Sequence, residues 1–186
     1  MRYAKIDEYE VVNGQLGGMS LYCQGCRWRC PNCFNPETHD FNGGHEWTPE
    51  VEDKFIELAS RPYIKRISIL GGEPLADENL DGVLNLVNRF RLLMPEKTIW
   101  LYTGYVFNFY EVYNSDHTEI EVLPKDNNAK NDFKRLEIIS KCDVLVDGRY
   151  IDTQRNLSKK WCGSDNQRVI SVQESLKQNK IILHCD

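Results

Sequence analysis

Three cysteines stand close together in the first fifth of the chain, as Cys26, Cys30 and Cys33. Their spacing lets all three thiols converge only where the backbone curls tightly around whatever they bind. Thiolates select soft metal centres, chiefly zinc, copper(I) and iron–sulfur clusters. Three cysteines on a [4Fe–4S] cluster would leave one iron without a protein ligand. An open position of this kind is typical of a reactive metal site rather than a structural one.

A fourth cysteine, Cys23, keeps a structural zinc site open as an alternative. Zinc sites built on four cysteines usually pair two CxxC motifs that are about 15–20 residues apart, and these four cysteines have no such separation. Cys23 also ends the apolar run of residues 19–23, where a cysteine is most often a small buried hydrophobe. We therefore predict a cluster on three cysteines with Cys23 outside it. A zinc site and unliganded thiols remain the alternatives.

A second group of residues with chemical potential is Gly71-Gly72-Glu73, which directly follows a predicted strand. Two adjacent glycines let a ligand approach the backbone with no side chain in the way. Their carbonyl groups, together with the Glu73 carboxylate, can accept hydrogen bonds from an ammonium group. The alternative is that the glycines form an ordinary turn and that Glu73 is a surface carboxylate.

Alternating strands and helices are predicted to position these groups. The apolar runs and periodic stripes indicate an α/β fold with a parallel sheet or a partial barrel. Thr48 is predicted to cap a helix that begins at Pro49, and residues 1–18 are predicted to lead into the first strand. Strands are predicted over residues 19–24, 64–70, 98–102, 142–148 and 181–183, and further helices over residues 79–93 and 131–140.

The residues with chemical potential fall where predicted strands end. In α/β sheets and barrels, ligands bind beyond the carboxyl ends of the strands. Four stretches occupy such positions, so we predict that they form one pocket. The stretches are the cysteine loop, Gly71–Glu73, Thr103–Tyr105 and Asp147-Gly148.

The pattern weakens between residues 107 and 134. Thr118, Ile120 and Val122 alternate with charged residues, which predicts a short exposed strand, and residues 123–128 have the composition of a loop. We predict that this stretch is an elaboration on the fold or a mobile loop.

The composition narrows the class of protein. A chain of 186 residues fits one domain, residues 1–186. A net charge of −5 argues against a nucleic-acid-binding surface. The sequence contains no apolar run long enough to cross a membrane and no signal peptide at its start. Seven clustered cysteines suit metal binding in a reducing compartment, so a cytoplasmic protein is expected.

The CxxxCxxC motif of residues 26–33 and the Gly-Gly-Glu motif resemble those of the radical S-adenosylmethionine (SAM) enzymes. Further segments in the same order resemble one subgroup, the anaerobic ribonucleoside-triphosphate reductase-activating proteins. The segments are Asn13-Gly14, residues 26–35, 41–44, 71–75, 100–105, 144–148 and 163–168.

This resemblance implies a partial (β/α) barrel, a [4Fe–4S] cluster and SAM as cofactors. It also implies that the protein generates a glycyl radical on the anaerobic ribonucleoside-triphosphate reductase, with reduced flavodoxin or a similar electron donor. The implied cluster ligands are Cys26, Cys30 and Cys33. The implied SAM-binding residues are Asn32, Cys33, Phe34, Gly71, Gly72, Glu73, Thr103 and Asp147.

The chain departs from the resembled pattern at three places. Asn32 stands before the third cysteine, where many radical SAM enzymes have an aromatic residue, and Phe34 follows that cysteine. Residues 13–18 differ from the Asn-Gly-Pro-Gly of many activases, and Cys162 stands where an arginine is common. The alternative functions are a radical SAM enzyme that acts on a small molecule and a zinc-stabilised module without catalysis.

Overall fold

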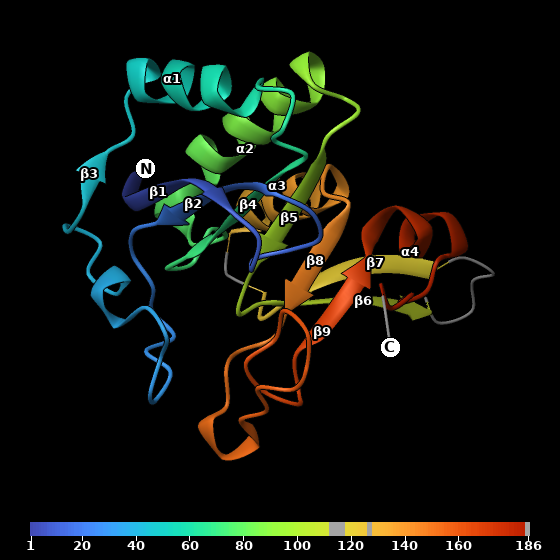
Figure 1. Ribbon diagram of the computed structural model, residues 1–186. Coiled ribbons are helices and arrows are strands. Elements are labelled where there is room, and N and C mark those ends of the chain that lie inside the picture. The colour runs from blue at the N-terminus through green and yellow to red at the C-terminus, as the bar shows by residue number, and fades with distance from the viewer. Residues whose placement is uncertain (112–117, 126–127, 185–186) are drawn as a thin grey trace.

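Seven strands form one mixed sheet through the middle of the protein (Figure 1). The computed structural model describes residues 1–111, 118–125 and 128–184. The spatial order of the strands is β3-β1-β2-β4-β5-β8-β9. Their bounds are β1 Arg2–Glu10, β2 Gly18–Cys23, β3 His45–Glu46, β4 Arg66–Gly71, β5 Thr98–Tyr102, β8 Val144–Asp147 and β9 Arg168–Ser171.

The four inner strands, β2, β4, β5 and β8, run parallel. Met19 pairs with Ile67, and Ile67 pairs with Ile99, so the carboxyl ends of these strands reach the same edge of the sheet. The predicted α/β order and all four inner strands are confirmed. The outer strands β1, β3 and β9 are antiparallel to their neighbours, and the sheet is open because β3 and β9 form its two edges.

The three outer strands were not predicted, and β3 has only two residues. β1 lies in the stretch that we expected to be only a lead-in to the sheet. Its residues are mostly half-buried and do not alternate between buried and exposed, so they carry no period-two signal. β9 has only four residues. The strand predicted over residues 181–183 is wrong, because that stretch makes an isolated bridge between Leu183 and Ile170.

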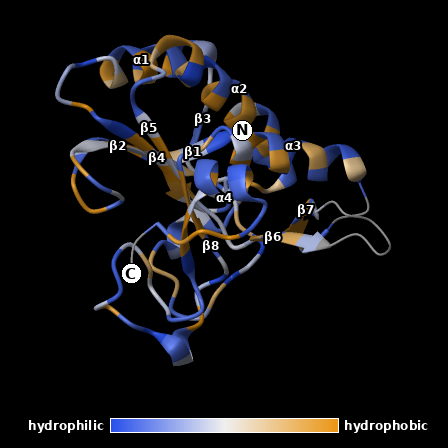
Figure 2. Cartoon of the chain, turned by 90° about the vertical axis from the view of Figure 1, so that its right-hand side faces the viewer, coloured by the Kyte–Doolittle hydropathy of each residue, from blue (hydrophilic) through white to orange (hydrophobic). Residues whose placement is uncertain are grey.

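Four helices pack on the sheet: α1 Pro49–Ala59, α2 Asp77–Leu93, α3 Ala129–Ser140 and α4 Val172–Gln178. The Thr48 hydroxyl accepts a hydrogen bond from the Val51 amide (3.4 Å), which confirms the predicted cap. Hydrophobic residues gather where these helices meet the sheet (Figure 2). Apolar side chains from one face of the sheet, such as Ile69 and Leu101, form this main core with Phe55 and Phe90 of the helices.

The opposite face of the sheet is lined by different side chains of the same strands. Trp100, Val144, Val146 and Val169 form a smaller apolar cluster there. On β4, Arg66 is fully buried, and its guanidinium lies 2.7 Å from a carboxylate oxygen of Glu10. Arg66 also donates to the Gln15 carbonyl (3.1 Å), and Ser68 donates to the Asn13 carbonyl. These contacts hold the loop of residues 11–17 over this second face.

The stretch from residue 107 to 134 is more regular than predicted. β6 Val106–Glu111 and β7 Thr118–Leu123 form a separate two-stranded antiparallel sheet. Buried Phe107 and Val122 join the main core, because they face one another across the two strands. The predicted strand near Thr118 is therefore confirmed, and the described residues of the stretch form a two-stranded elaboration on the fold. Residues 126 and 127 of the predicted loop lie outside the described residues.

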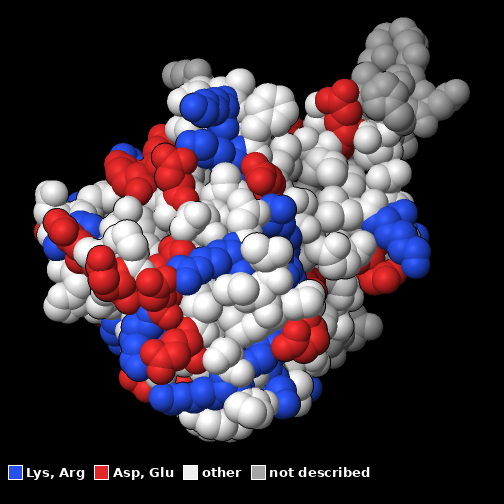
Figure 3. Space-filling model, turned by 90° about the horizontal axis from the view of Figure 1, so that it is seen from above, with Lys and Arg blue, Asp and Glu red and all other residues white. Residues whose placement is uncertain are grey.

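The outer surface carries charges of both signs. Acidic and basic side chains are interspersed on the face that is seen from above (Figure 3). None of the helices in the described parts of the chain combines the length and the apolar character that a membrane crossing requires.

Two short 3-10 helices, Pro36–Thr38 and Asp152–Gln154, lie in loops beyond β2 and β8.

Candidate iron–sulfur and cofactor site

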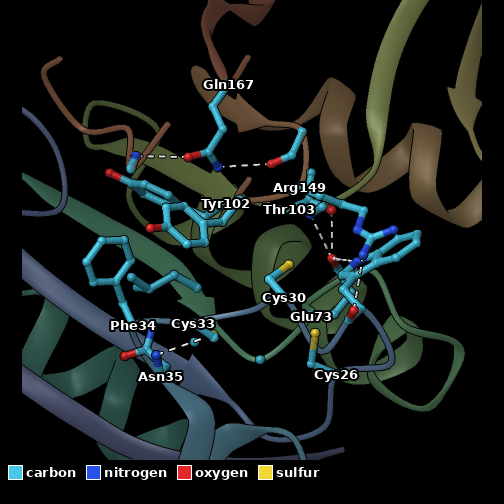
Figure 4. Close-up of a pocket in the computed structure, with 18 of the residues that line it drawn as sticks. Cys26, Cys30, Cys33, Phe34, Asn35, Glu73, Tyr102, Thr103, Arg149 and Gln167 are labelled. Atoms are coloured by element: carbon cyan, nitrogen blue, oxygen red, sulfur yellow. Dashed lines mark hydrogen bonds between the residues drawn. The ribbon is translucent and has the colours of Figure 1, made fainter. Parts of the chain in front are cut away.

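One cavity of about 350 Å³ lies at the carboxyl edge of the parallel strands (Figure 4). The loops that follow β2, β4, β5 and β8 all contribute to its lining, as the strand order predicted. The loop before β9 completes the wall with Trp161, Cys162 and Gly163, which we did not predict to do so. Parallel strands explain the convergence, because they deliver their following loops to the same edge.

The three predicted ligand cysteines, Cys26, Cys30 and Cys33, line this cavity. Cys26 is buried, and the other two are partly exposed. Burial raises the pKa of the Cys26 thiol to about 11. Cys23 lies on β2 and points into the main core beneath the helices, where it is fully buried. The structure therefore separates Cys23 from the three cysteines of the cavity.

The cysteine loop curls through unusual backbone conformations. Arg29 and Asn32 have φ values of 45° and 53°, in the left-handed region. The Cys33 amide donates to the Cys30 carbonyl (3.1 Å), which closes a tight turn. Gly25 begins the loop with a φ of 97°, and a Cβ there would lie 2.1 Å from the ring of Phe41. Glycine is therefore required at the entry to the loop.

Three thiols around one cavity suit an iron–sulfur cluster. In a cluster each cysteine binds a different iron, so the thiols surround the inorganic core. A mononuclear zinc site requires its ligands to converge on a single ion. Among the described residues, no three His, Cys, Asp or Glu side chains converge on one ion. The three thiols that line the cavity are the type of donor that the predicted cluster uses.

The glycine pair brings two loops together. The Gly72 amide donates to the Cys23 carbonyl, and the Glu73 amide donates to the Gly25 carbonyl, each at 2.8 Å. A Cβ on Gly72 would lie 2.6 Å from the Gly25 carbonyl oxygen. Gly71 has a φ of 99°. Both glycines line the cavity, so they leave room for a ligand. Gly72 is also needed for packing, because a side chain there would push the cysteine loop away.

The Glu73 carboxylate is buried and receives four hydrogen bonds. One oxygen accepts from the Thr103 hydroxyl (2.7 Å) and the Leu75 amide (2.9 Å). The other accepts from the Trp28 indole (2.6 Å) and the Gly104 amide (2.8 Å). Burial raises the pKa of Glu73, and these donors oppose that shift. A carboxylate accepts about four hydrogen bonds in all, so the acceptor sites of Glu73 are filled. Glu73 therefore links three loops, and a ligand ammonium group would have to bind the nearby backbone carbonyl groups instead.

Of the remaining residues predicted to bind SAM, two line the cavity and two do not. Phe34 and Thr103 line the cavity, and Phe34 packs edge-on against Tyr150 at 5.2 Å. Asn32 and Asp147 lie outside the lining. The Asn32 amide donates to Asp152 (2.8 Å). The buried Asp147 carboxylate accepts from Arg168 and from the Phe107 amide, each at 2.9 Å.

Trp28 is a residue of the site that sequence reasoning missed. It lies between the first two cysteines and connects the cysteine loop to Glu73. Its ring packs edge-on against Tyr105 (5.1 Å), and the guanidinium of Arg149 lies over it (5.2 Å). A tryptophan inside the cysteine loop was the available signal, but its partners come from distant parts of the chain.

Gln167 is the second residue that was missed, and it shapes the far wall. Its carbonyl oxygen accepts from the Gly163 amide (2.8 Å), and its amide nitrogen donates to the Gly148 carbonyl (2.9 Å). Gln167 therefore fixes the loop of Trp161 and Cys162 against the end of β8.

Residues 12–170 match the family model for a 4Fe-4S single cluster domain. The chain belongs to this family. It is also similar over almost its whole length to proteins named anaerobic ribonucleoside-triphosphate reductase-activating protein. The relative from Vibrio cholerae is 34% identical and covers 90% of this chain and 96% of its own. Those from phage T4 and Escherichia coli K12 are 32% and 33% identical, over 92% and 91% of this chain and 94% and 97% of their own.

Membership of the family agrees with the position of the site. The matched range contains the cysteine loop, the glycine pair and the loop before β9, so it includes every segment that lines the cavity. The resemblance drawn from the sequence motifs is thereby confirmed.

Proposed function

We propose that this protein is a radical SAM activase that generates a glycyl radical on an anaerobic ribonucleoside-triphosphate reductase. The observation that carries the proposal is the cavity shared by Cys26, Cys30, Cys33 and the glycine pair, in a chain of this family. The open sheet with four parallel inner strands is compatible with a partial barrel of the radical SAM type.

The residues of the cavity have separable roles in this proposal. The three thiolates hold a [4Fe–4S] cluster, and the carbonyl groups near Gly71 and Gly72 accept hydrogen bonds from the SAM ammonium group. When bound, the cluster supplies the electron that cleaves SAM into methionine and a 5′-deoxyadenosyl radical, which takes a hydrogen atom from the target glycine. Phe34 and Thr103 complete the cofactor pocket. Asn32 and Asp147 are proposed to act from outside the lining, by fixing the loops that carry it.

The substrate in this proposal is a protein. The relatives are named as activators of the reductase, and this chain has almost the same length as each of them. A small chain leaves few residues to enclose a metabolite. The electron donor is proposed to be reduced flavodoxin or a similar protein, and thiols that must stay reduced favour the cytoplasm.

The test is anaerobic reconstitution followed by reaction with the reductase. The reconstituted protein should bind about four irons per chain, as a [4Fe–4S] cluster requires, and should cleave SAM slowly when reduced. Adding the reductase should produce a glycyl radical signal in electron paramagnetic resonance. Deuterium from a labelled target glycine should appear in 5′-deoxyadenosine. Label transfer from a small metabolite instead, with none from the reductase, would reject the activase role.

A further inference from the structure

The cavity extends beyond the cysteines to a second region, the inner end, which is lined by Asn13, Tyr22, Tyr102, Trp161 and Cys162. Tyr102, Trp161 and Cys162 pack against the apolar cluster on the second face of the sheet. Figure 4 shows Tyr102 on the opposite side of the cavity from Cys26 and Glu73. The inner end therefore belongs to the same cavity as the cysteines but is formed by other residues.

The hydroxyl of Tyr102 is buried and has no hydrogen-bond partner among the described residues. Other tyrosines around the cavity are paired. The Tyr22 hydroxyl accepts from Asn13 (3.1 Å), and the Tyr150 hydroxyl donates to Asp152 (2.7 Å). Burial raises the pKa of Tyr102, so this phenol stays protonated and can donate. Buried polar groups are nearly always paired with protein or water, so an unpaired hydroxyl that faces a cavity is free to pair with a ligand group.

The walls of the inner end are held in place without that ligand. The ring of Trp161 packs edge-on against Trp100 at 4.9 Å. Gln167 accepts from the Gly163 amide and donates to the Gly148 carbonyl. The Tyr102 hydroxyl is therefore presented by a preformed wall, where a group that enters the cavity can pair with it.

The entrance beside the inner end is apolar. Val12 lines the cavity and is also 68% exposed. Val11 and Leu16, on the same loop, are 61% and 70% exposed. Hydrogen bonds from buried Arg66 and Ser68 hold the backbone of this loop. An exposed apolar edge on a fixed loop suits contact with a protein segment better than contact with water.

A glycine-bearing segment matches these features. Glycine has no side chain, so it can be recognised only through its backbone amide and carbonyl groups and through the residues beside it. A protonated phenol donates to a backbone carbonyl, and the apolar entrance can receive flanking apolar side chains.

We propose that the inner end binds the target segment of the reductase, with the Tyr102 hydroxyl donating a hydrogen bond to a backbone carbonyl next to the target glycine. This inference rests on the proposed function and adds a substrate-binding residue to it. In this arrangement Tyr102 holds the glycine within the cavity that the cysteines and the glycine pair also line.

The test compares Tyr102→Phe with wild type, and with Tyr110→Phe as the matched control. Tyr110 lies on β6, outside the cavity lining, and its hydroxyl is paired with Glu119. Tyr102→Phe removes one oxygen and keeps the ring, and that oxygen has no protein partner to lose. Each reconstituted variant is assayed for SAM binding, SAM cleavage without reductase, affinity for the reductase and the rate of glycyl radical formation.

We expect Tyr102→Phe to leave SAM binding and partner-free cleavage unchanged and to weaken reductase binding by about fivefold to tenfold, the value of one hydrogen bond. The rate of radical formation at limiting reductase should fall by the same factor, and Tyr110→Phe should match wild type. Weaker SAM binding in Tyr102→Phe would assign the hydroxyl to the cofactor and overturn the inference. Unchanged reductase binding would overturn it as well.

The proposed function and this inference can fail separately. If wild type binds the reductase but forms no radical, the activase role is rejected, and the ratio of the two binding constants still decides the role of Tyr102. If wild type does not bind the reductase at all, both are rejected.

Discussion

The buried Glu73 carboxylate and the buried hydroxyl of the partly buried Tyr102 lie on opposite sides of one cavity, and their hydrogen bonding differs. Glu73 receives four hydrogen bonds from three loops. Tyr102 receives none from the described residues. A satisfied carboxylate stabilises the free protein, whereas an unpaired hydroxyl costs stability until a ligand arrives. The comparison separates a group that builds the site from a group that is available to a substrate.

The same contrast extends to the loops. Gly25 and Gly72 press the cysteine loop against the loop after β4, with 2.8 Å hydrogen bonds between them. At the inner end, aromatic packing and Gln167 hold the wall and leave space in front of it. The cysteine loop is held by close backbone contacts. The wall of the inner end is held by side-chain contacts and borders the cavity.

The largest effect is expected from the cysteines. Cys30→Ala should abolish cluster assembly and all SAM cleavage, because it removes a ligand that lines the cavity. Cys23→Ala should retain a full complement of iron, because Cys23 lies in the main core. Iron and sulfide analysis with electron paramagnetic resonance measures both. Loss of the cluster in Cys23→Ala would show that Cys23 is a fourth ligand. It would reject the prediction that one iron has no protein ligand.

Gly72→Val should abolish SAM binding and also reduce cluster assembly. The new side chain would block the approach of a ligand, and the backbone neighbours of Gly72 mean that it also displaces the cysteine loop. Iron content and SAM affinity are measured together. Gly82→Ala is the matched control, since its new Cβ meets only the flexible side chain of Met1. A Gly72→Val protein with normal iron and normal SAM affinity would contradict the close approach of these loops.

Glu73→Ala should lower the free energy of unfolding by at least about 3 kcal/mol, because buried donors lose their acceptor. Glu73→Gln keeps the shape and one acceptor oxygen, so its loss should be smaller. Urea unfolding of the cluster-free proteins measures this difference without interference from cofactor binding. Equal stability of wild type and Glu73→Ala would mean that the four hydrogen bonds do not stabilise the fold.

The smallest effects come from two aromatic substitutions that each remove one polar group. Trp28→Phe removes the indole N–H that is bound to Glu73 and also shortens the ring system, so it should cost at least about 1–3 kcal/mol of unfolding free energy. Tyr102→Phe removes a hydroxyl without a partner, so its unfolding free energy should equal or slightly exceed that of wild type. Thermal unfolding of the two variants side by side measures the contrast. A clear loss of stability in Tyr102→Phe would show that the hydroxyl already has a partner in the free protein.

Much of the site could be predicted because its signals are local. The spacing of Cys26, Cys30 and Cys33 and the Gly71-Gly72 pair are contiguous patterns that suit particular ligands. Four apolar runs marked the inner strands, and parallel order then placed the loops at one edge. The cap at Thr48 is signalled by the adjacent pair Thr48-Pro49, so it could also be predicted.

The rest depended on contacts between residues that are far apart in the sequence. Nothing near Glu73 in the chain reveals that Trp28 is its donor, and nothing near Tyr102 reveals that its hydroxyl lacks one. β1 carries no alternating pattern, because its charged side chains are accommodated by neighbours from other strands.

The sequence by itself therefore determined which residues can bind a cluster and where the strands end, since both follow from spacing and periodicity along the chain. Only the tertiary structure decided which buried polar groups are paired and which remain open to a ligand. The physical reason is that hydrogen-bond satisfaction is a property of the neighbours brought together by packing, and local sequence does not specify those neighbours.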